Sequence, residues 1–476
     1  MLETKKIKKK KRDKMSKGSG VDYSCYGCGA PLQTVENDAP GYVDADMYQL
    51  KKKHHQLRTV LCGRCQLLSH GHMITAVGGN GGYAGGKQFV TAEELREKLS
   101  HLRYEKALIV KLVDIVDFNG SFLARVRDLA GANPIILVVT KVDLLPKGTD
   151  FNCVGDWVVE ATMKKKLNVI SVHLTSSKSL VGIVELYQNS EREKGLLFTC
   201  QGSANVGKSA FINALLKMLS YKDPVAAMAR RYKPIQSAVP GTTVGPIEIN
   251  AFIGGVCDKL YDTPGVHLHH RQAAVVHSED LPLLAPRSRL RGQSLTSAQV
   301  PANDMAPEVI ISNGMNGYSI FWGGLVRIDV LKVLPETCLT FYGPKQLKLA
   351  LYLLKEIGIL LTPPTGKQIV DQWSGLETHR ELQINFEDAN RPACDVAISG
   401  LGWICVEPVG KGVGVSSELN LEETEVAKEL HLRIHVPKPV EIFIRPPMPV
   451  GKAGGDWYQY PDLTEKEEEV RPKWFF

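Results

Sequence analysis

A glycine-rich stretch near the middle of the chain has the spacing of a phosphate-binding loop. Gly202 is followed after four residues by Gly207, Lys208 and Ser209, and the flanking residues predict a strand before the loop and a helix after it. In such a loop, backbone N–H groups and the helix N-terminus hold phosphates. The lysine reaches the β- and γ-phosphates, and the serine hydroxyl binds Mg²⁺. We therefore expect this loop to bind a nucleotide with Mg²⁺.

Two further motifs follow this loop along the chain. Thr242 and Thr243 lie in a turn before an apolar stretch, and residues 262–265 read Asp-Thr-Pro-Gly. A switch threonine closes on Mg²⁺ and the γ-phosphate, and we favour Thr243 for this role, with Thr242 in reserve. We expect Asp262 to hold Mg²⁺ through water and the Gly265 N–H to sense the γ-phosphate.

Two motifs that could read a base precede the loop. Residues 140–143, Thr-Lys-Val-Asp, end an apolar stretch and resemble the Asn-Lys-x-Asp motif of GTPases. The Asp143 carboxylate would accept hydrogen bonds from guanine N1–H and the exocyclic amine, a donor pair that adenine lacks. Lys141 would lie under the base and brace the phosphate loop. Residues 176–178, Ser-Ser-Lys, resemble the loop whose backbone N–H contacts guanine O6.

These motifs contain every element of a Ras-like GTPase, but the base-reading half comes first. The order indicates a circular permutation, which is possible because the two ends of a domain often lie close together. The predicted ligands are GTP or GDP and Mg²⁺, the latter held by Ser209, Thr243 and Asp262. The predicted nucleotide-binding residues are Thr140, Lys141, Asp143, Ser176, Ser177, Lys178, Gly202, Asn205, Val206, Gly207, Lys208, Ser209, Ala210, Thr242, Thr243, Asp262 and Gly265.

Four cysteines near the N-terminus form two C-x-x-C pairs separated by 33 residues. They are Cys25, Cys28, Cys62 and Cys65. Two such pairs predict a structural zinc site of four thiolates, which leaves no open position for catalysis. A redox pair and disulfides are the alternatives, and a nearby histidine could replace one cysteine. The histidines in reach are His54, His55, His70 and His72.

The composition is that of a globular protein of about three domains. The 476 residues are 43% hydrophobic, and no apolar run approaches the roughly 18 residues that span a bilayer. The net charge of +7 belongs to the first twenty residues, which hold nine Lys or Arg and two Asp or Glu. We expect a disordered tail that is a solvated terminus, a phosphate-binding segment or a nuclear signal.

We divide the chain into six parts. These are the basic tail (1–20), a zinc-binding module (21–77), a Gly-rich linker (78–90), a circularly permuted GTPase domain (91–280), a Pro-rich connector (281–310) and a C-terminal domain (311–476). The predicted fold class is α/β, a circularly permuted Ras-like P-loop domain preceded by a small zinc-binding module and followed by a C-terminal domain.

Two cysteine pairs followed by a permuted GTPase resemble the YqeH family of ribosome-assembly GTPases. Further matches are "GLVRIDVL", "DVAISGLGWICVEPVG" and the stretch from residue 441 onward, which resembles the plant chloroplast branch, the brassinazole-insensitive pale green type. The resemblance implies a β-rich α+β C-terminal domain that binds RNA, and GTP hydrolysis in rRNA processing or ribosomal subunit maturation. The implied partner is rRNA or a pre-ribosomal subunit, with no membrane span and no DNA; the oligomeric state is left open.

The implied location is the chloroplast, with the mitochondrion as alternative. The basic start is not Ser-rich like a transit peptide and has no apolar core like a secretory signal. Plastid localisation therefore depends on the branch resemblance. A competing interpretation is a GTPase switch that acts on a non-RNA protein partner and uses zinc for docking. A third interpretation is an inactive GTP-binding scaffold.

Catalysis is the unusual part of the sequence. Ras-like GTPases carry a glutamine after the switch-two glycine, which orients the attacking water, whereas this chain has Val266. We therefore expect slow intrinsic hydrolysis that K⁺ or a partner stimulates. Asn205 matches the loop asparagine that helps ligate K⁺ in potassium-activated relatives, or else it tolerates an unusual backbone angle. The expected catalytic residues are Asn205, Lys208, Thr243 and Gly265.

Overall fold

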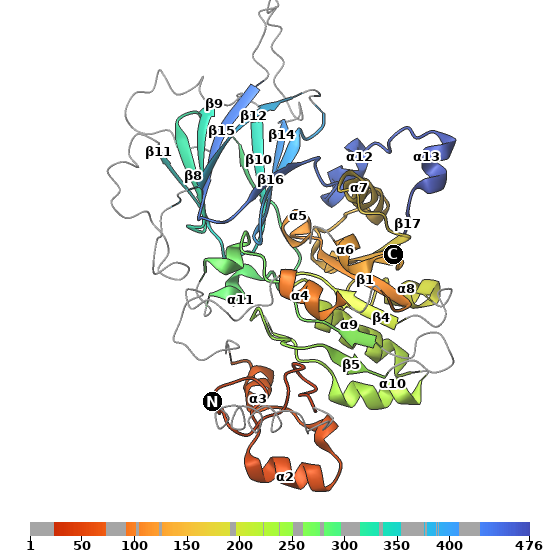
Figure 1. The fold of residues 1–476 in the computed structure, drawn as a ribbon. Coiled ribbons are helices and arrows are strands. Elements are labelled where there is room, and N and C mark those ends of the chain that lie inside the picture. The colour runs from red at the N-terminus through yellow and green to blue at the C-terminus, as the bar shows by residue number, and fades with distance from the viewer. Residues whose placement is uncertain are drawn as a thin grey trace, which may run out of the picture.

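The computed structural model describes three regions that follow one another in space (Figure 1). A cysteine-rich module lies at one end, an α/β domain in the middle and a pair of β-sheets at the other end. The described residues are 23–72, 92–100, 104–122, 126–190, 197–221, 223–237, 239–250, 260–276, 280–296, 315–332, 337–353, 376, 378–386, 388, 390–408 and 429–476. The predicted basic tail, the Gly-rich linker and residues 297–310 of the connector lie outside them.

The middle domain is built on a seven-stranded sheet in the order β17-β3-β2-β1-β4-β6-β5. All neighbouring pairs are parallel except β5 with β6, which is antiparallel. The strands are β1 (Ala107–Asp114), β2 (Ile135–Thr140), β3 (Ser171–Leu174), β4 (Leu197–Gln201), β5 (Ile247–Ile249), β6 (Leu260–Asp262) and β17 (Lys473–Phe475).

Helices cover both faces of this sheet, which explains why its central strands read as continuous apolar runs. All eight residues of β1 are buried. Alternate β1 residues contribute to two separate cores, one containing Ile109 and Trp157 and the other Leu108 and Phe211. The helices are α4 (Ala92–Lys98), α5 (Phe118–Ser121), α6 (Val126–Ala130), α7 (Phe151–Lys164), α8 (Ile183–Ser190), α9 (Lys208–Leu219) and α10 (Pro224–Ala229).

Along the chain, the strands before the two base motifs come first and the strand before the phosphate loop comes later. In the sheet, β3 and β2, which precede the base motifs, are adjacent, and β1 alone separates β2 from β4, which precedes the phosphate loop. Parallel strands end at the same edge of a sheet, where α/β domains bind their ligands. The topology therefore gathers the base motifs and the phosphate loop at one edge.

The cysteine-rich module is small and has a core of its own. It contains α2 (Ala45–Lys53), the 3₁₀ helix η1 (Leu57–Thr59) and α3 (Gly63–Ser69). Its core combines the four cysteines with Leu57 and Val60. Partly buried Ile235 and Val244 of the middle domain pack against that core, so the module contacts the middle domain.

The third region is a pair of five-stranded sheets packed face to face around one core. One sheet has the order β16-β13-β14-β10-β7 and the other β11-β8-β9-β15-β12. The strands are β7 (Gln293–Thr296), β8 (Tyr318–Trp322), β9 (Val326–Lys332), β10 (Thr337–Tyr342), β11 (Leu349–Leu353), β12 (Thr378–Asn385), β13 (Cys394–Ile398), β14 (Gly402–Pro408), β15 (Glu429–Val436) and β16 (Ile442–Arg445).

The boundaries of this region differ from the predicted ones at both ends. Strand β7 and α11 (Leu281–Leu284) lie in the stretch predicted as a connector, and β7 pairs with β10. The final segment returns to the middle domain, where α12 (Gly451–Trp457) and α13 (Glu465–Val470) lie beside α7 and β17 extends the sheet (Figure 1). The indole of Trp474 donates to Asp156 at 3.0 Å, and Arg471 pairs with the same carboxylate at 3.2 Å.

The predicted fold class is confirmed as a mixed α/β chain with a β-rich C-terminal region. Among the residues that the structure describes, no helix combines the length and apolar character needed to cross a membrane.

Candidate nucleotide-binding site

The phosphate loop joins the end of β4 to the start of α9, as the sequence predicts. Asn205 and Gly207 have positive φ angles of 62° and 94°, so the loop turns sharply before Lys208 begins the helix. The Lys208 ammonium is buried and donates to the carbonyl oxygens of Ser203 at 2.8 Å and Gly202 at 3.3 Å. Burial lowers its pKa to about 8. The loop is therefore folded around its lysine in the form that could receive phosphate.

Three predicted Mg²⁺-binding side chains meet at the start of α9. The Ser209 hydroxyl donates to Asp262 Oδ2 at 2.8 Å and lies 3.5 Å from the Thr243 hydroxyl. Asp262 Oδ1 is buried and has no hydrogen-bond partner among the described residues. Burial raises the Asp262 pKa to about 6, although Lys208 and the Ser209 hydrogen bond act in the opposite direction. Two hydroxyls and a carboxylate with a spare oxygen fit the ligand preference of Mg²⁺.

The structure separates the two candidate switch threonines. The Thr242 hydroxyl donates to the carbonyl oxygen of Val239 at 2.6 Å, within its own loop. The Thr243 hydroxyl faces Ser209 instead. This geometry favours Thr243 over Thr242 for the magnesium position.

The first base motif, at the end of β2, braces the phosphate loop. The Thr140 hydroxyl lies 2.6 Å from the carbonyl oxygen of Val206, to which it can donate. The Lys141 ammonium donates to the Asn205 carbonyl at 3.1 Å and forms an ion pair with Asp114. Asp114 ends β1 and is buried, but no motif marked it in the sequence. It is a site residue that the sequence analysis missed.

Asp143 is oriented by the second base motif. Its Oδ1 accepts a hydrogen bond of 2.7 Å from the Ser176 hydroxyl, which joins the two loops at the edge of the sheet. In the turn that follows, Ser177 is half-buried and Lys178 is exposed. Of the two base motifs, Lys141 lines the cavity over the phosphate loop, whereas Asp143, Ser177 and Lys178 are not among its lining residues.

Val266 holds the switch-two segment to the phosphate loop through its backbone. Its N–H donates to the Gly202 carbonyl at 3.2 Å, and its own carbonyl accepts from the Ala204 N–H at 2.8 Å. The Val266 side chain is buried in the core on one face of the sheet. It therefore cannot guide water at the site, as its residue type predicts.

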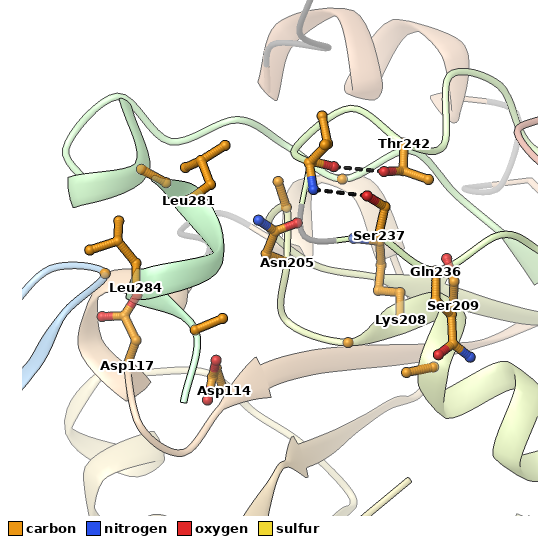
Figure 2. Close-up of a pocket in the computed structure, with 18 of the residues that line it drawn as sticks. Asp114, Asp117, Asn205, Lys208, Ser209, Gln236, Ser237, Thr242, Leu281 and Leu284 are labelled. Carbon is orange, nitrogen blue, oxygen red and sulfur yellow. Dashed lines mark hydrogen bonds between the residues drawn. The ribbon is translucent and has the colours of Figure 1, made fainter. Parts of the chain in front are cut away.

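A cavity of about 460 Å³ lies over the phosphate loop. Figure 2 shows Leu281 and Leu284 of α11 on one side of Asn205 and Ser237 and Thr242 on the other. The segment that carries Ser237, Thr242 and Thr243, here called switch one, therefore forms the wall opposite α11. The turn between β13 and β14 of the β-rich region also lines the cavity, through Gly400 and Leu401. The sequence analysis did not predict that the third region reaches the nucleotide cavity.

The four N-terminal cysteines form a buried cluster. Their sulfur atoms all lie within 4.8 Å of one another, and the described histidines nearby are not part of the cluster. The thiolate is the form of cysteine that binds metal. Four thiolates that can approach one ion fit the predicted zinc site.

The cysteine-rich module contacts the segment that carries Thr243. The Cys28 carbonyl accepts hydrogen bonds from the Val244 N–H at 2.7 Å and the Gly245 N–H at 3.1 Å. The buried Arg64 guanidinium of α3 donates to the carbonyl oxygens of Gly241 at 3.0 Å and Thr242 at 3.3 Å. These contacts flank Thr243, and sequence spacing could not have predicted them.

The comparisons with known proteins agree with this geometry. A family model described as "50S ribosome-binding GTPase" matches residues 198–298. The chain is 67% identical over 461 residues to a protein of Arabidopsis thaliana named "NO-associated protein 1, chloroplastic/mitochondrial". The aligned region covers 95% of this chain and 81% of that protein. It is also 31% identical over 401 residues to the protein named YqeH of Bacillus subtilis. That aligned region covers 82% of this chain and 94% of the Bacillus protein.

Proposed function

The chain belongs to the YqeH family of GTPases, and on this premise we propose that it hydrolyses GTP to drive a step of ribosomal subunit maturation. The observation that carries this proposal is the family model, whose description names ribosome binding and which covers the phosphate loop and both switch segments. In a GTPase of this kind the γ-phosphate orders the switch segments, and hydrolysis releases them. A partner that binds the ordered form would therefore be released when GTP is hydrolysed.

The chemistry that we propose for the site follows the geometry of its side chains. Lys208 would exchange its two carbonyl partners for β- and γ-phosphate oxygens, and the Gly265 N–H would hydrogen-bond the γ-phosphate. Ser209, Thr243 and Asp262 would hold Mg²⁺, which neutralises phosphate charge when bound. Residues 202–210 would wrap the phosphates through their backbone, so Val206 and Ala210 contribute N–H groups.

We also infer that guanine is the base and that the domain is a circular permutation. Asp143 would accept from guanine while Ser176 holds its carboxylate in place. Lys141 would lie under the base, and Ser177 and Lys178 would supply backbone N–H groups near guanine O6. The sheet order supports the permutation, since β4 with its phosphate loop lies between strands that precede and follow it in the chain.

Three further roles belong to the same proposal. The cysteine cluster would hold one structural Zn²⁺. The partner would be rRNA or a pre-ribosomal subunit, bound in part by the β-rich region. The location would be an organelle, in keeping with the name of the Arabidopsis relative, and we favour the chloroplast over the mitochondrion. Asn205 lines the cavity and would contribute to a K⁺ site.

The test is nucleotide-dependent co-sedimentation with organellar ribosomal particles. The wild-type chain should sediment with one class of subunit in the presence of a non-hydrolysable GTP analogue and be released with GDP. The matched variant is Asp143→Asn, which should bind xanthosine nucleotides in place of guanosine nucleotides because xanthine carries an oxygen where guanine has an amine. Its sedimentation should then follow the xanthosine analogue alone.

Two outcomes would overturn parts of the proposal. If neither nucleotide state sediments with ribosomal particles or retains RNA, the GTPase acts on a protein partner. If Asp143→Asn keeps its preference for guanosine nucleotides, Asp143 does not read the base.

A further inference from the structure

Arg271 lies in the nucleotide cavity, six residues after the γ-phosphate sensor Gly265. Its side chain is only 11% exposed, so the guanidinium has a fixed place. Nε donates to Asp117 Oδ2 at 2.9 Å, and one Nη donates to the carbonyl oxygen of Ala204 at 2.6 Å. The other Nη makes no hydrogen bond to a described residue. A buried cation in a phosphate cavity therefore has one donor group left for a ligand.

The anchoring points of Arg271 place it at the reacting end of the cavity. Ala204 belongs to the phosphate loop and lies against Gly265. A Cβ added to Gly265 would lie 2.7 Å from Ala204 Cα and 2.9 Å from Lys208 Nζ, so these three residues are in close contact. The residue that holds the guanidinium is thus packed beside both the γ-phosphate sensor and the phosphate lysine. Arg271 also contributes to the lowered pKa of Lys208, after burial, so the two charges interact.

We propose that Arg271 is a catalytic residue that stabilises the transition state of GTP hydrolysis from within the chain. In this step, the water oxygen forms a bond to the γ-phosphorus while the bond to the β–γ bridging oxygen breaks. The electron pair of that bond stays on GDP, and the water proton ends on the released phosphate. The free Nη of Arg271 donates to oxygens on which negative charge develops, without gaining or losing a proton.

A positive charge at this position can raise the hydrolysis rate of a site in which Val266 replaces the water-orienting glutamine. An arginine that reaches the γ-phosphate raises GTPase rates by about 10³–10⁵, whether it comes from a partner or from the same chain. Arg271 needs no partner, because Asp117 and the Ala204 carbonyl already hold it in place. The Gly400 N–H also hydrogen-bonds Asp117. Asp117 is therefore a positioning residue that connects the guanidinium to the β-rich region.

The alternative is that Arg271 and Asp117 form a structural ion pair, as many buried pairs do. The two roles make different predictions. A structural pair affects all nucleotide states and the stability of the fold alike. A catalytic arginine contributes mainly when charge develops between the β- and γ-phosphates, so its loss leaves GDP binding nearly intact.

The experiment compares Arg271→Ala and Arg271→Lys with wild type in the full chain. We expect single-turnover hydrolysis to fall at least 100-fold in both, because lysine cannot bridge three acceptors as a guanidinium does. GDP affinity should stay within threefold. Binding of GDP with aluminium fluoride, which mimics the transferring phosphoryl group, should be lost. All three readings are taken in sodium and in potassium buffers, with thermal unfolding as a check on folding.

The matched control is Arg471→Lys, which alters another buried arginine paired with an aspartate, at the far edge of the same sheet. It should hydrolyse GTP at the wild-type rate. Three results would overturn the proposal. They are a hydrolysis rate within threefold of wild type, an equal loss of affinity for GDP and for GDP with aluminium fluoride, or a loss confined to potassium buffer. None depends on which particle the GTPase acts on.

Discussion

The two neighbours of the GTPase domain contact its site in different ways. The cysteine-rich module contacts switch one through the Cys28 carbonyl, which accepts two backbone hydrogen bonds, and through the Arg64 guanidinium, which donates two. The β-rich region contacts the segment after switch two, where the Gln272 N–H donates to the Ser399 carbonyl at 2.9 Å. One neighbour thus flanks Thr243, which we propose as a magnesium ligand, and the other flanks the arginine that we propose for catalysis.

The difference in packing indicates how firmly each neighbour is attached. Among the described residues of the GTPase domain, Ile235 and Val244 pack against the cysteine core, and Tyr232 contacts Tyr26 of the module edge to face. On the other side, Ala397, Trp403 and Met448 of the C-terminal segment belong to the same core as the GTPase sheet. We therefore expect the cysteine side to be a separable contact that acts on GTP binding, and the β-rich side to be a fixed part of the domain that acts on hydrolysis.

The largest effect should come from Cys62→Ser, which removes one ligand of the cluster. Structural zinc contributes on the order of 10 kcal/mol to the folding of small modules, so we expect metal loss and unfolding of residues 23–72. Switch one then loses hydrogen bonds worth about 1 kcal/mol each. Affinity for Mg²⁺·GTP should fall about 100-fold while GDP affinity changes little. Metal analysis and fluorescent-nucleotide titration measure the two parts.

The control for this change is Cys153→Ser, which alters a partly buried thiol of α7 outside the cluster. It should keep both its metal and its Mg²⁺·GTP affinity. Unchanged Mg²⁺·GTP affinity in metal-free Cys62→Ser would break the comparison, because it would show that the module does not support switch one.

A smaller effect on the same side should come from Arg64→Met, which keeps the stem of the side chain but removes its donors. The two lost hydrogen bonds, to Gly241 and Thr242, have a charged donor, and we expect a cost of about 1.5 kcal/mol, the lower end of the range for such a bond. Mg²⁺·GTP affinity should drop roughly tenfold at full metal content. The titration should be repeated with GDP, and an equal drop there would mean that Arg64 supports the fold and not switch one.

The smallest effect should come from Gly400→Ala on the β-rich side. Gly400 has a φ of 78°, and an added Cβ would lie 2.9 Å from the Gln272 backbone nitrogen. The strain should cost about 1–2 kcal/mol and shift the segment that carries Arg271. We expect hydrolysis to slow a few-fold with Mg²⁺·GTP affinity unchanged, measured by single turnover and titration. A change in affinity with an unchanged rate would reverse the assignment of the two neighbours.

The sequence predicted the parts of the site whose chemistry is local. The phosphate loop depends on glycines and a lysine at fixed spacing, and the cysteine pairs depend on two thiols in one turn, so both are visible in a short window. Asp114, Arg64 and Arg271 could not be found this way. Their roles depend on contacts with segments distant in the chain, and each alone reads as an ordinary charged residue.

The same reason explains why the domain boundaries shifted. Strand β7 is four residues long, and β17 is three, so neither gives a clear alternating pattern. Whether such a short stretch is a strand depends on the edge that it meets. Strand β17 meets β3, and that pairing is set by the fold of both regions and not by the residues Lys473–Phe475.

The position of β17 has a consequence for how the chain is made. The N-terminus of a nascent chain emerges first from the ribosome, and domains tend to fold as they emerge. Here the hydrogen bond from Arg471 to Asp156 joins residues 315 positions apart, so the edge of β3 stays open during synthesis of the whole β-rich region. Open strand edges pair readily with other chains. We therefore expect nascent chains, and chains shortened before residue 473, to expose the edge of β3 that β17 covers in the complete fold.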